Sequence, residues 1–184
     1  MRLLQLHELS QLYDLNQSIA QDPATQAFLN PRSEAYLGQF IHTATGFTIG
    51  AYDQEQLIGY RAVHYTSQHL EHVPCPLVAP KYYPKTAHFA GVGVAPNYRR
   101  QGIAQQMISI ALYRLCHQGF RYVTVRVRPI HEQSIDLFTS FGFQIVYLKK
   151  DMEPVKECFF LLKELTPDQP KSFIGQAHFH LSVL

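Results

Sequence analysis

Residues 87–128 constrain the fold of this chain more than any other segment. They predict a strand over residues 87–94, a loop, a helix over residues 103–118 and a second strand over residues 121–128. The helix is indicated by apolar residues at helical spacing, which are Ile103, Met107, Ile110, Ala111 and Leu115. Gly119 follows where a left-handed residue commonly ends a helix. This order is a βαβ unit, whose strands run parallel and are joined by a right-handed crossover.

The loop inside this unit predicts an anion-binding site. Residues 99–102 read Arg-Arg-Gln-Gly directly before the helix. The first amides of a helix have no partner within it, and the helix dipole favours negative charge at that end. Arg99 and Arg100 add positive charge, and Gly102 lets the backbone approach a bulky diphosphate closely.

The other segments predict further strands and helices. Strands are expected over residues 1–6, 47–52, 57–66, 143–150 and 157–165, and helices over residues 8–20, 33–43 and 132–141. Ser33 is the expected N-cap of the second helix, and the polar residues 53–56 predict a hairpin turn. Residues 67–86 hold four prolines and predict a long loop. The fold class is therefore α/β, with a mixed, mainly antiparallel sheet and helices on both faces.

Length and composition predict one globular domain. The chain has 184 residues, of which 46% are hydrophobic and 16% charged. We expect a domain over residues 1–165 and a tail over residues 166–184, whose end, 177–184, can pair as an edge strand. In the tail, His178 and His180 lack an evident third ligand, so no metal site is predicted.

Charge and cysteine usage exclude several classes of partner. A net charge of +2 is too weak for a nucleic-acid surface, and no apolar run is long enough to span a membrane. Three widely spaced cysteines without a secretory signal favour a reducing compartment, so we expect a cytoplasmic protein.

The sequence is compatible with a monomer and with a homodimer. The tail could cover a sheet edge or exchange with a partner chain.

Two stretches resemble signatures of the GCN5-related N-acetyltransferase (GNAT) superfamily. The pattern [RQ]-x-x-G-x-[GA] is filled by Arg99, Gly102 and Ala104. Residues 131–143, HEQSIDLFTSFGF, resemble N-x-x-A-I-x-L-Y-x-x-x-G-F. The matching residues there are Ile135, Leu137, Gly142 and Phe143, whereas His131, Ser134 and Phe138 replace the usual Asn, Ala and Tyr. The two signatures support each other because both lie in the expected structural context.

The resemblance implies a fold and a cofactor site. The parallel strand pair is expected to splay into a cleft for acetyl-CoA. The pyrophosphate is expected on the residues that begin the helix, which are Arg99, Arg100, Gln101, Gly102, Ile103 and Ala104. The main chain at Val92 and Val94 is expected to pair with the pantetheine arm and to polarise the thioester carbonyl. His131 and Phe138 are expected to line the cofactor, and a neutral primary amine then attacks the thioester directly in a ternary complex.

The same resemblance leaves the acid and the base open. The usual proton donor for the CoA thiolate is the Tyr replaced here by Phe138, which has no proton to give. Ser134, one helical turn earlier, is either a substitute donor or a small packing residue. Family members often carry a Glu on the strand at 87–94, where His88 is the only titratable residue and is either the base or structural. Tyr82, Tyr83 and His64 are weaker candidates.

Three alternative functions are compatible with these residues. The first is an N-acetyltransferase that uses acetyl-CoA and a small-molecule or peptide amine acceptor. The second is an acyl-CoA-binding or sensing module with a degenerate active site, favoured by Phe138 and by the strand without a carboxylate. The third is an acyl or aminoacyl transferase with another donor.

Overall fold

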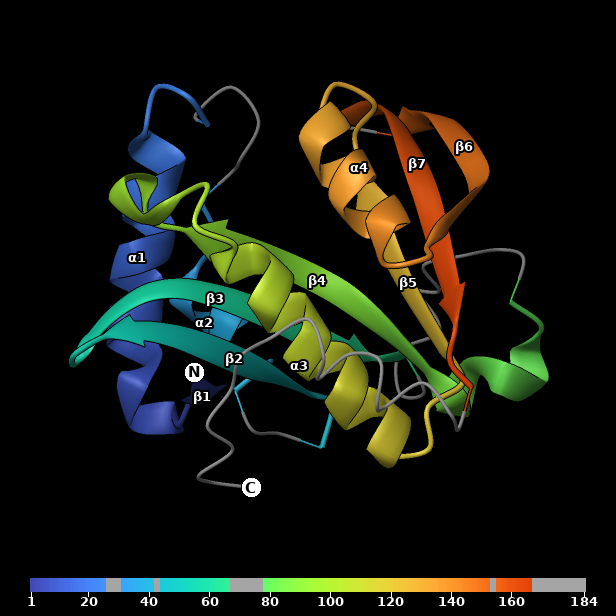
Figure 1. Cartoon of the computed structure of the whole chain (residues 1–184), viewed down its shortest axis with the longest axis horizontal. Helices are drawn as coiled ribbons and strands as arrows, with labels where there is room; N and C mark the ends of the chain where they lie inside the picture. Colours follow the sequence, from blue (N-terminus) through green and yellow to red (C-terminus); the bar gives the residue numbers. More distant parts are fainter. Residues whose placement is uncertain (26–30, 42–43, 67–77, 153–154, 167–184) are drawn as a thin grey trace.

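A seven-stranded sheet forms the centre of the molecule, as the computed structural model shows (Figure 1). The structure describes residues 1–25, 31–41, 44–66, 78–152 and 155–166. The strands are β1 (Arg2–Leu3), β2 (Gly46–Asp53), β3 (Gln56–Tyr65), β4 (Thr86–Val94), β5 (Tyr122–Val127), β6 (Gln144–Met152) and β7 (Val155–Glu164). They lie in the order β1-β2-β3-β4-β5-β7-β6. Every neighbouring pair is antiparallel except β4 and β5, as the sequence predicts for a mixed sheet.

Helices cover both faces of this sheet. They are α1 (Leu9–Gln21), α2 (Glu34–Gly38), α3 (Ile103–His117) and α4 (Glu132–Ser140), with 3₁₀ turns η1 (Leu6–Glu8), η4 (Pro80–Lys85) and η5 (Pro96–Tyr98). One apolar core joins α3 and α4 to the sheet, and a second joins α1 and α2 to the opposite face. The two cores confirm the prediction of helices on both faces, because each needs an apolar stripe of helix against the sheet.

The βαβ unit lies at the centre of the sheet. β4 and β5 pair in parallel from Thr86 with Tyr122 to Phe89 with Val125, and α3 crosses between them. Gly119, with φ +79°, ends α3 as predicted, and Phe120 N–H donates back to the Leu115 carbonyl oxygen. The predicted parallel connection is therefore confirmed.

Beyond Phe89 the two parallel strands separate. β4 continues to Val94, whereas its pairing with β5 ends at Phe89 (Figure 1). The β3–β4 register shifts at the same point, since Val63 pairs with Phe89 and Ala62 with Gly91, which leaves Ala90 as an extra residue. A bulge of this kind bends its strand. We call the separated part, residues 90–94 of β4 facing residues 126–127 of β5, the β4–β5 fork.

Some predicted boundaries are wrong. The first strand is only Arg2–Leu3 because η1 follows, held by the Gln5 N–H, which donates to the Glu8 carboxylate at 2.9 Å. Ser33 does cap α2 by accepting from the Tyr36 N–H, but α2 ends at Gly38 and not at residue 43. Glycine in a helix interior is unfavourable, and the chain turns there to bury the apolar residues that follow.

Two predictions lie outside the described residues. They are the edge strand at 177–184 with its two histidines, and the part of the proline-rich loop over residues 67–77. The described end of that loop is not irregular, since η4 forms there. None of the helices in the described ranges is long and apolar enough to cross a membrane.

Candidate active site

The N-terminus of α3 opens at the β4–β5 fork. Gly102 is the N-cap, with φ +77°, and no side chain of the described residues caps the helix. A Cβ atom at Gly102 would meet no heavy atom within 4 Å, so the space in front of the amides is open. Arg100 also has a positive φ, +64°. Two left-handed residues in one short loop, directly before uncapped helix amides, form a concave backbone with N–H groups free to bind an anion.

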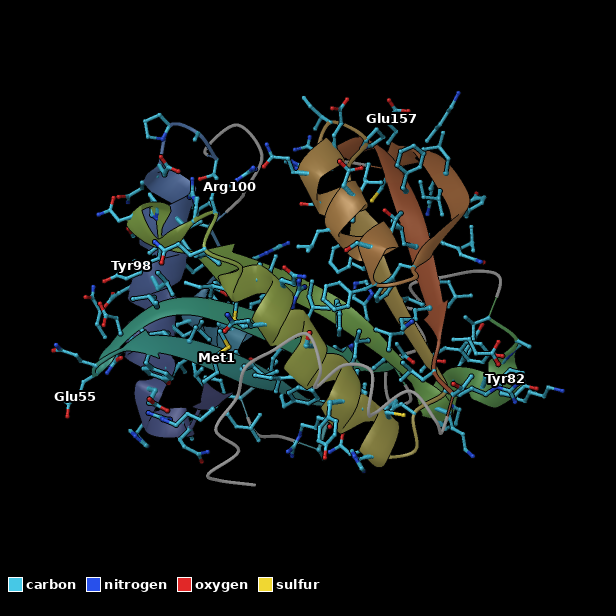
Figure 2. All side chains as sticks on the ribbon, in the orientation of Figure 1. Met1, Glu55, Tyr82, Tyr98, Arg100 and Glu157 are labelled. Carbon is cyan, nitrogen blue, oxygen red and sulfur yellow. The ribbon has the colours of Figure 1, made fainter. Side chains whose placement is uncertain are left out.

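The two arginines of this loop have different environments. The Arg99 guanidinium lies 2.6 Å from the Asp22 carboxylate, just after α1, and its Nε donates to the Val94 carbonyl oxygen at 3.2 Å. This bond lowers the pKa of Asp22. Arg99 therefore fixes the loop to α1 and to the end of β4. The exposed Arg100 reaches Gln133 of α4 at 3.3 Å, across the open side of the fork (Figure 2).

The main chain of β4 is exposed on one edge at the fork. Val92 and Val94 pair with Arg61 and Gly59 of β3, and the pairing of β4 with β5 has already ended at Phe89. The edge of β4 toward β5 thus has no strand partner over these residues in the described part of the chain. An extended ligand can add to such an edge through backbone hydrogen bonds. Val92 and Val94 are accordingly well placed for the predicted pantetheine contact.

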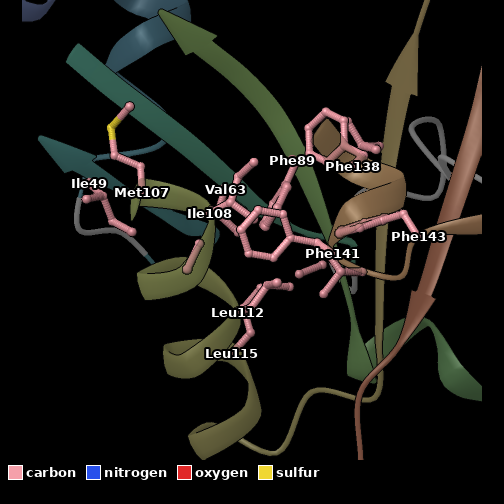
Figure 3. Packing of buried hydrophobic residues seen from close by; sticks show 14 of the residues in the cluster. Ile49, Val63, Phe89, Met107, Ile108, Leu112, Leu115, Phe138, Phe141 and Phe143 are labelled. Carbon is pink, nitrogen blue, oxygen red and sulfur yellow. The ribbon is translucent and has the colours of Figure 1, made fainter. Parts of the chain in front are cut away.

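The first turns of α4 lie on the other side of the fork. His131 is the N-cap and is half-buried, and burial together with Arg128 lowers its pKa. Ser134 is also half-buried and lies one turn before Phe138. Phe138 is buried against Phe89 and Phe143, with ring centroids 6.2 and 5.2 Å away (Figure 3). An aromatic cluster therefore occupies the position where the family resemblance expects a hydroxyl.

His88 lies on the opposite face of the sheet from Phe89, because neighbouring strand residues alternate. It is buried, and its Nδ1 lies 3.1 Å from the Thr124 hydroxyl on β5. Burial, followed by the nearby Arg126 and His64, lowers the pKa of His88 well below its ordinary value. His88 is thus neutral at physiological pH. It faces the side of the sheet covered by α1 and α2, where Phe40 packs on the adjacent His64 ring.

Of the weaker candidates, Tyr82 and Tyr83 lie away from these residues, whereas His64 lies beside His88. Tyr82 and Tyr83 belong to η4, and Figure 2 shows Tyr82 far from Arg100. His64 is paired with His88 across β3 and β4. Among the described residues, no group of three or more His, Cys, Asp or Glu side chains could hold a metal ion.

Sequence reasoning missed Arg61 of β3. Its side chain is on the α3 and α4 face, and its guanidinium carbon lies 4.8 Å from the Phe89 ring and 5.4 Å from the Phe138 ring. The residue is 1% exposed, and its Nε and Nη2 atoms have no hydrogen-bond partner within the described ranges. Burial lowers its pKa to about 9. The available signal was a single Arg inside the apolar run LIGYRAV.

The chain matches the family model described as Acetyltransferase (GNAT) family over residues 9–143. Solved structures with the same fold include Arabidopsis thaliana NAA60 in complex with acetyl-CoA, with 14% identity and a TM-score of 0.69 over 89% of this chain and 97% of that one. They also include the ribosomal-protein-S18-alanine N-acetyltransferase of Escherichia coli, with 14% identity and a TM-score of 0.66 over 88% and 90%.

A third similar structure is an N-acetyltransferase from Staphylococcus aureus Mu50, with 15% identity and a TM-score of 0.66 over 90% of this chain and 97% of that chain. No curated protein sequence matches the chain. The family match covers most of the chain, and the sheet order, the parallel pair and the fork agree with it. The chain belongs to the GNAT acetyltransferase family.

Proposed function

We propose that this protein transfers an acetyl group from acetyl-CoA to a primary amine, by direct attack of the amine within a ternary complex. The observation that carries the proposal is the open, uncapped N-terminus of α3 at the β4–β5 fork. It offers unpaired amides to a diphosphate next to an unpaired strand edge that fits an extended arm. Family membership supports the acetyl donor.

The residues divide the binding work between the two sides of the fork. The backbone from Arg100 to Ala104 holds the pyrophosphate, and the Arg100 side chain adds positive charge there. Arg99 acts through its bond to Asp22, which positions the loop. The main chain at Val92 and Val94 pairs with the pantetheine arm and polarises the thioester carbonyl. His131, the N-cap of α4, and Phe138 line the opposite side of the fork.

The acceptor amine approaches from the face of the sheet that carries His88. A neutral imidazole there accepts the proton that the attacking amine releases. The relatives support an amine acceptor in a peptide or a small molecule, since the Escherichia coli enzyme is named for an alanine of a ribosomal protein. Free Cys116 and Cys158 agree with the proposed cytoplasmic location.

The test combines binding with turnover. Acetyl-CoA binding is measured by titration calorimetry, and release of free thiol is followed with a panel of small amines and peptide N-termini. Binding together with acceptor-dependent thiol release is the expected result. Binding without turnover on any acceptor would favour the sensing module, for which the buried Phe138 in place of a hydroxyl is the supporting observation. Absence of binding contradicts both functions.

The His88→Gln variant tests the proposed base. We expect kcat to fall by about 10²–10⁴-fold, the usual size of a general-base contribution, with little change in acetyl-CoA affinity. Because the pKa of His88 is lowered, the acid limb of the wild-type kcat/KM profile should lie below about pH 6.5. His117→Gln, an exposed histidine on α3, is the matched control. An unchanged kcat in His88→Gln removes His88 from the mechanism.

A further inference from the structure

The Arg61 guanidinium is a buried cation without an anionic partner in the described part of the chain. Its residue is 1% exposed, and two of its nitrogens have no hydrogen-bond partner among the residues that the structure describes. An unpaired buried charge normally costs several kcal/mol, because the interior does not replace the water that the ion loses. The flanking aromatic rings offset only a small part of that cost. Such a group is kept where a bound molecule brings the missing negative charge.

Among the described residues, no titratable group near the guanidinium supplies this charge. The titratable groups that it influences are Tyr60, on the same strand, and His88, on β4. The pKa of Tyr60 is raised by burial and that of His88 is lowered, so both are neutral at physiological pH. From α4 the guanidinium meets the Phe138 ring, and from β4 the Phe89 ring.

The guanidinium lies at the start of the β4–β5 fork. Arg61 pairs with Val92, which is past the end of the parallel pairing, and its side chain returns toward Phe89, the last paired residue. The Phe138 ring lies next to the Phe89 ring (Figure 3), with its centroid 5.4 Å from the guanidinium carbon. A donor whose diphosphate lies at Gly102, and whose arm follows β4 toward Phe89, brings its reacting end to this point.

We propose that Arg61 is a catalytic residue that stabilises the CoA thiolate as it leaves. This inference rests on the proposed function. The amine nitrogen bonds to the thioester carbon, and the carbon–sulfur bond breaks with its electron pair on sulfur. The amine proton passes to the base, and the thiolate forms an ion pair with the guanidinium, which keeps its protons. The cation thus compensates for the hydroxyl that Phe138 lacks.

The electrostatic effect is one that appears mainly in the transition state. The neutral thioester gives the guanidinium no counterion, whereas the leaving sulfur gives it a full negative charge. In a site of low dielectric, such a differential interaction lowers the barrier and leaves ground-state binding nearly unchanged. Loss of Arg61 should therefore lower kcat more than it raises KM.

The thiol pKa of bound CoA tests the proposal without any acceptor. Free CoA is added to the wild type, to Arg61→Met and to Arg61→Lys, and the thiolate is followed by its ultraviolet absorption as pH rises. In the wild type we expect a bound thiol pKa at least about one unit below that of free CoA in the same buffer, since a close opposite charge lowers a pKa by 1–3 units. The value should return to the ordinary range in Arg61→Met and stay low in Arg61→Lys.

Desulfo-CoA, which lacks the sulfur atom of CoA, is the control ligand. At pH 8 the wild type should bind CoA more tightly than desulfo-CoA, by the factor that the measured shift of the thiol pKa requires at that pH, and Arg61→Met should bind the two equally. An unshifted thiol pKa in the wild type overturns the proposal even if no variant folds. A donor with a carboxylate on its acyl chain, such as succinyl-CoA, binding tenfold more tightly than acetyl-CoA also overturns it, because the cation would then recognise the acyl group.

The outcomes separate this inference from the proposed function. If CoA and acetyl-CoA both fail to bind, the proposed function fails and this inference fails with it. If both bind and the thiol pKa is the same in the wild type and in Arg61→Met, only the role of Arg61 is wrong. Where an acceptor is found, kcat should fall by about 10²–10³-fold in Arg61→Met, the usual loss for one oxyanion-type donor.

Discussion

Gly102 holds a backbone conformation that other residues adopt only at a cost. Its φ of +77° belongs to the left-handed region, and the absence of a Cβ leaves open the space before the α3 amides. Arg100 accepts a similar φ of +64° two residues earlier. Strain at a non-glycine residue is kept where the surrounding structure needs that backbone path. The loop conformation and the proposed anion site therefore depend on the same backbone.

Gly102→Glu is expected to abolish CoA binding, because it places both bulk and negative charge against the pyrophosphate. Gly119→Glu is a matched control. Gly119 has φ +79° and equally open surroundings, but it lies at the other end of α3. Both substitutions carry the same strain, about 1–2 kcal/mol, so both variants should unfold at similar denaturant concentrations. Calorimetry should show CoA binding lost only in Gly102→Glu, and normal binding there would refute the phosphate-loop assignment.

At the scale of elements, local patterns in the sequence predict the βαβ unit, whereas the splayed strand pair is expected only from the family resemblance and is confirmed by the fork. Helix α3 and its neighbouring strands follow from apolar spacing and from Gly119, which are local signals. The fork depends on the bulge at Ala90, and no local pattern distinguishes that alanine from a regular strand residue. The partner of Arg99, Asp22, is far away in the sequence, and so are the rings around Arg61. Contacts between distant segments set the site, whereas local propensity sets its elements.

The N-terminal segment is joined to the sheet by a buried carboxylate. Glu8, with a side chain only 4% exposed, accepts from both Arg2 terminal nitrogens at 2.7 and 2.6 Å and from the Tyr52 hydroxyl at 2.7 Å. The Arg2 guanidinium is the main cause that lowers the pKa of Glu8 to about 2. This cluster replaces the longer first strand that the sequence predicts.

Glu8→Gln should lower the free energy of unfolding at pH 7 by roughly 2–3 kcal/mol, because the carboxylate is more stable in the folded state than in the unfolded chain. The folded pKa is below the unfolded value of 4.5, so this stabilisation is present above pH 4.5 and is lost as pH falls toward 2. Urea unfolding at several pH values measures it. Glu55→Gln, at the exposed β2–β3 turn, is the control. Equal losses in both variants would contradict this role.

At the scale of the whole molecule, the features that form the candidate site lower the free energy of unfolding. The sheet is opened at the fork, and a guanidinium lies inside the larger apolar core, next to Phe89 and Phe138. A chain selected only for stability would fill that place with an apolar side chain. Natural proteins keep such costly groups where activity needs them.

Arg61→Met should therefore make the protein more stable while it impairs turnover. Replacing a buried unpaired charge with an apolar side chain of similar length is expected to raise the free energy of unfolding by about 1–4 kcal/mol. Arg114→Met is the matched control. Arg114 also lies over an aromatic ring, at 5.3 Å from Phe47, and has an unsatisfied Nε. It is only half-buried and lies outside the fork, so the stability gain of Arg114→Met should be smaller.

Urea unfolding without ligand measures the free energy of unfolding of both variants. If Arg61→Met is less stable than the wild type, the guanidinium has a partner inside the fold and needs no anion from a ligand. A gain in stability together with a loss of turnover would show that the fold keeps this cation for the reaction at the fork.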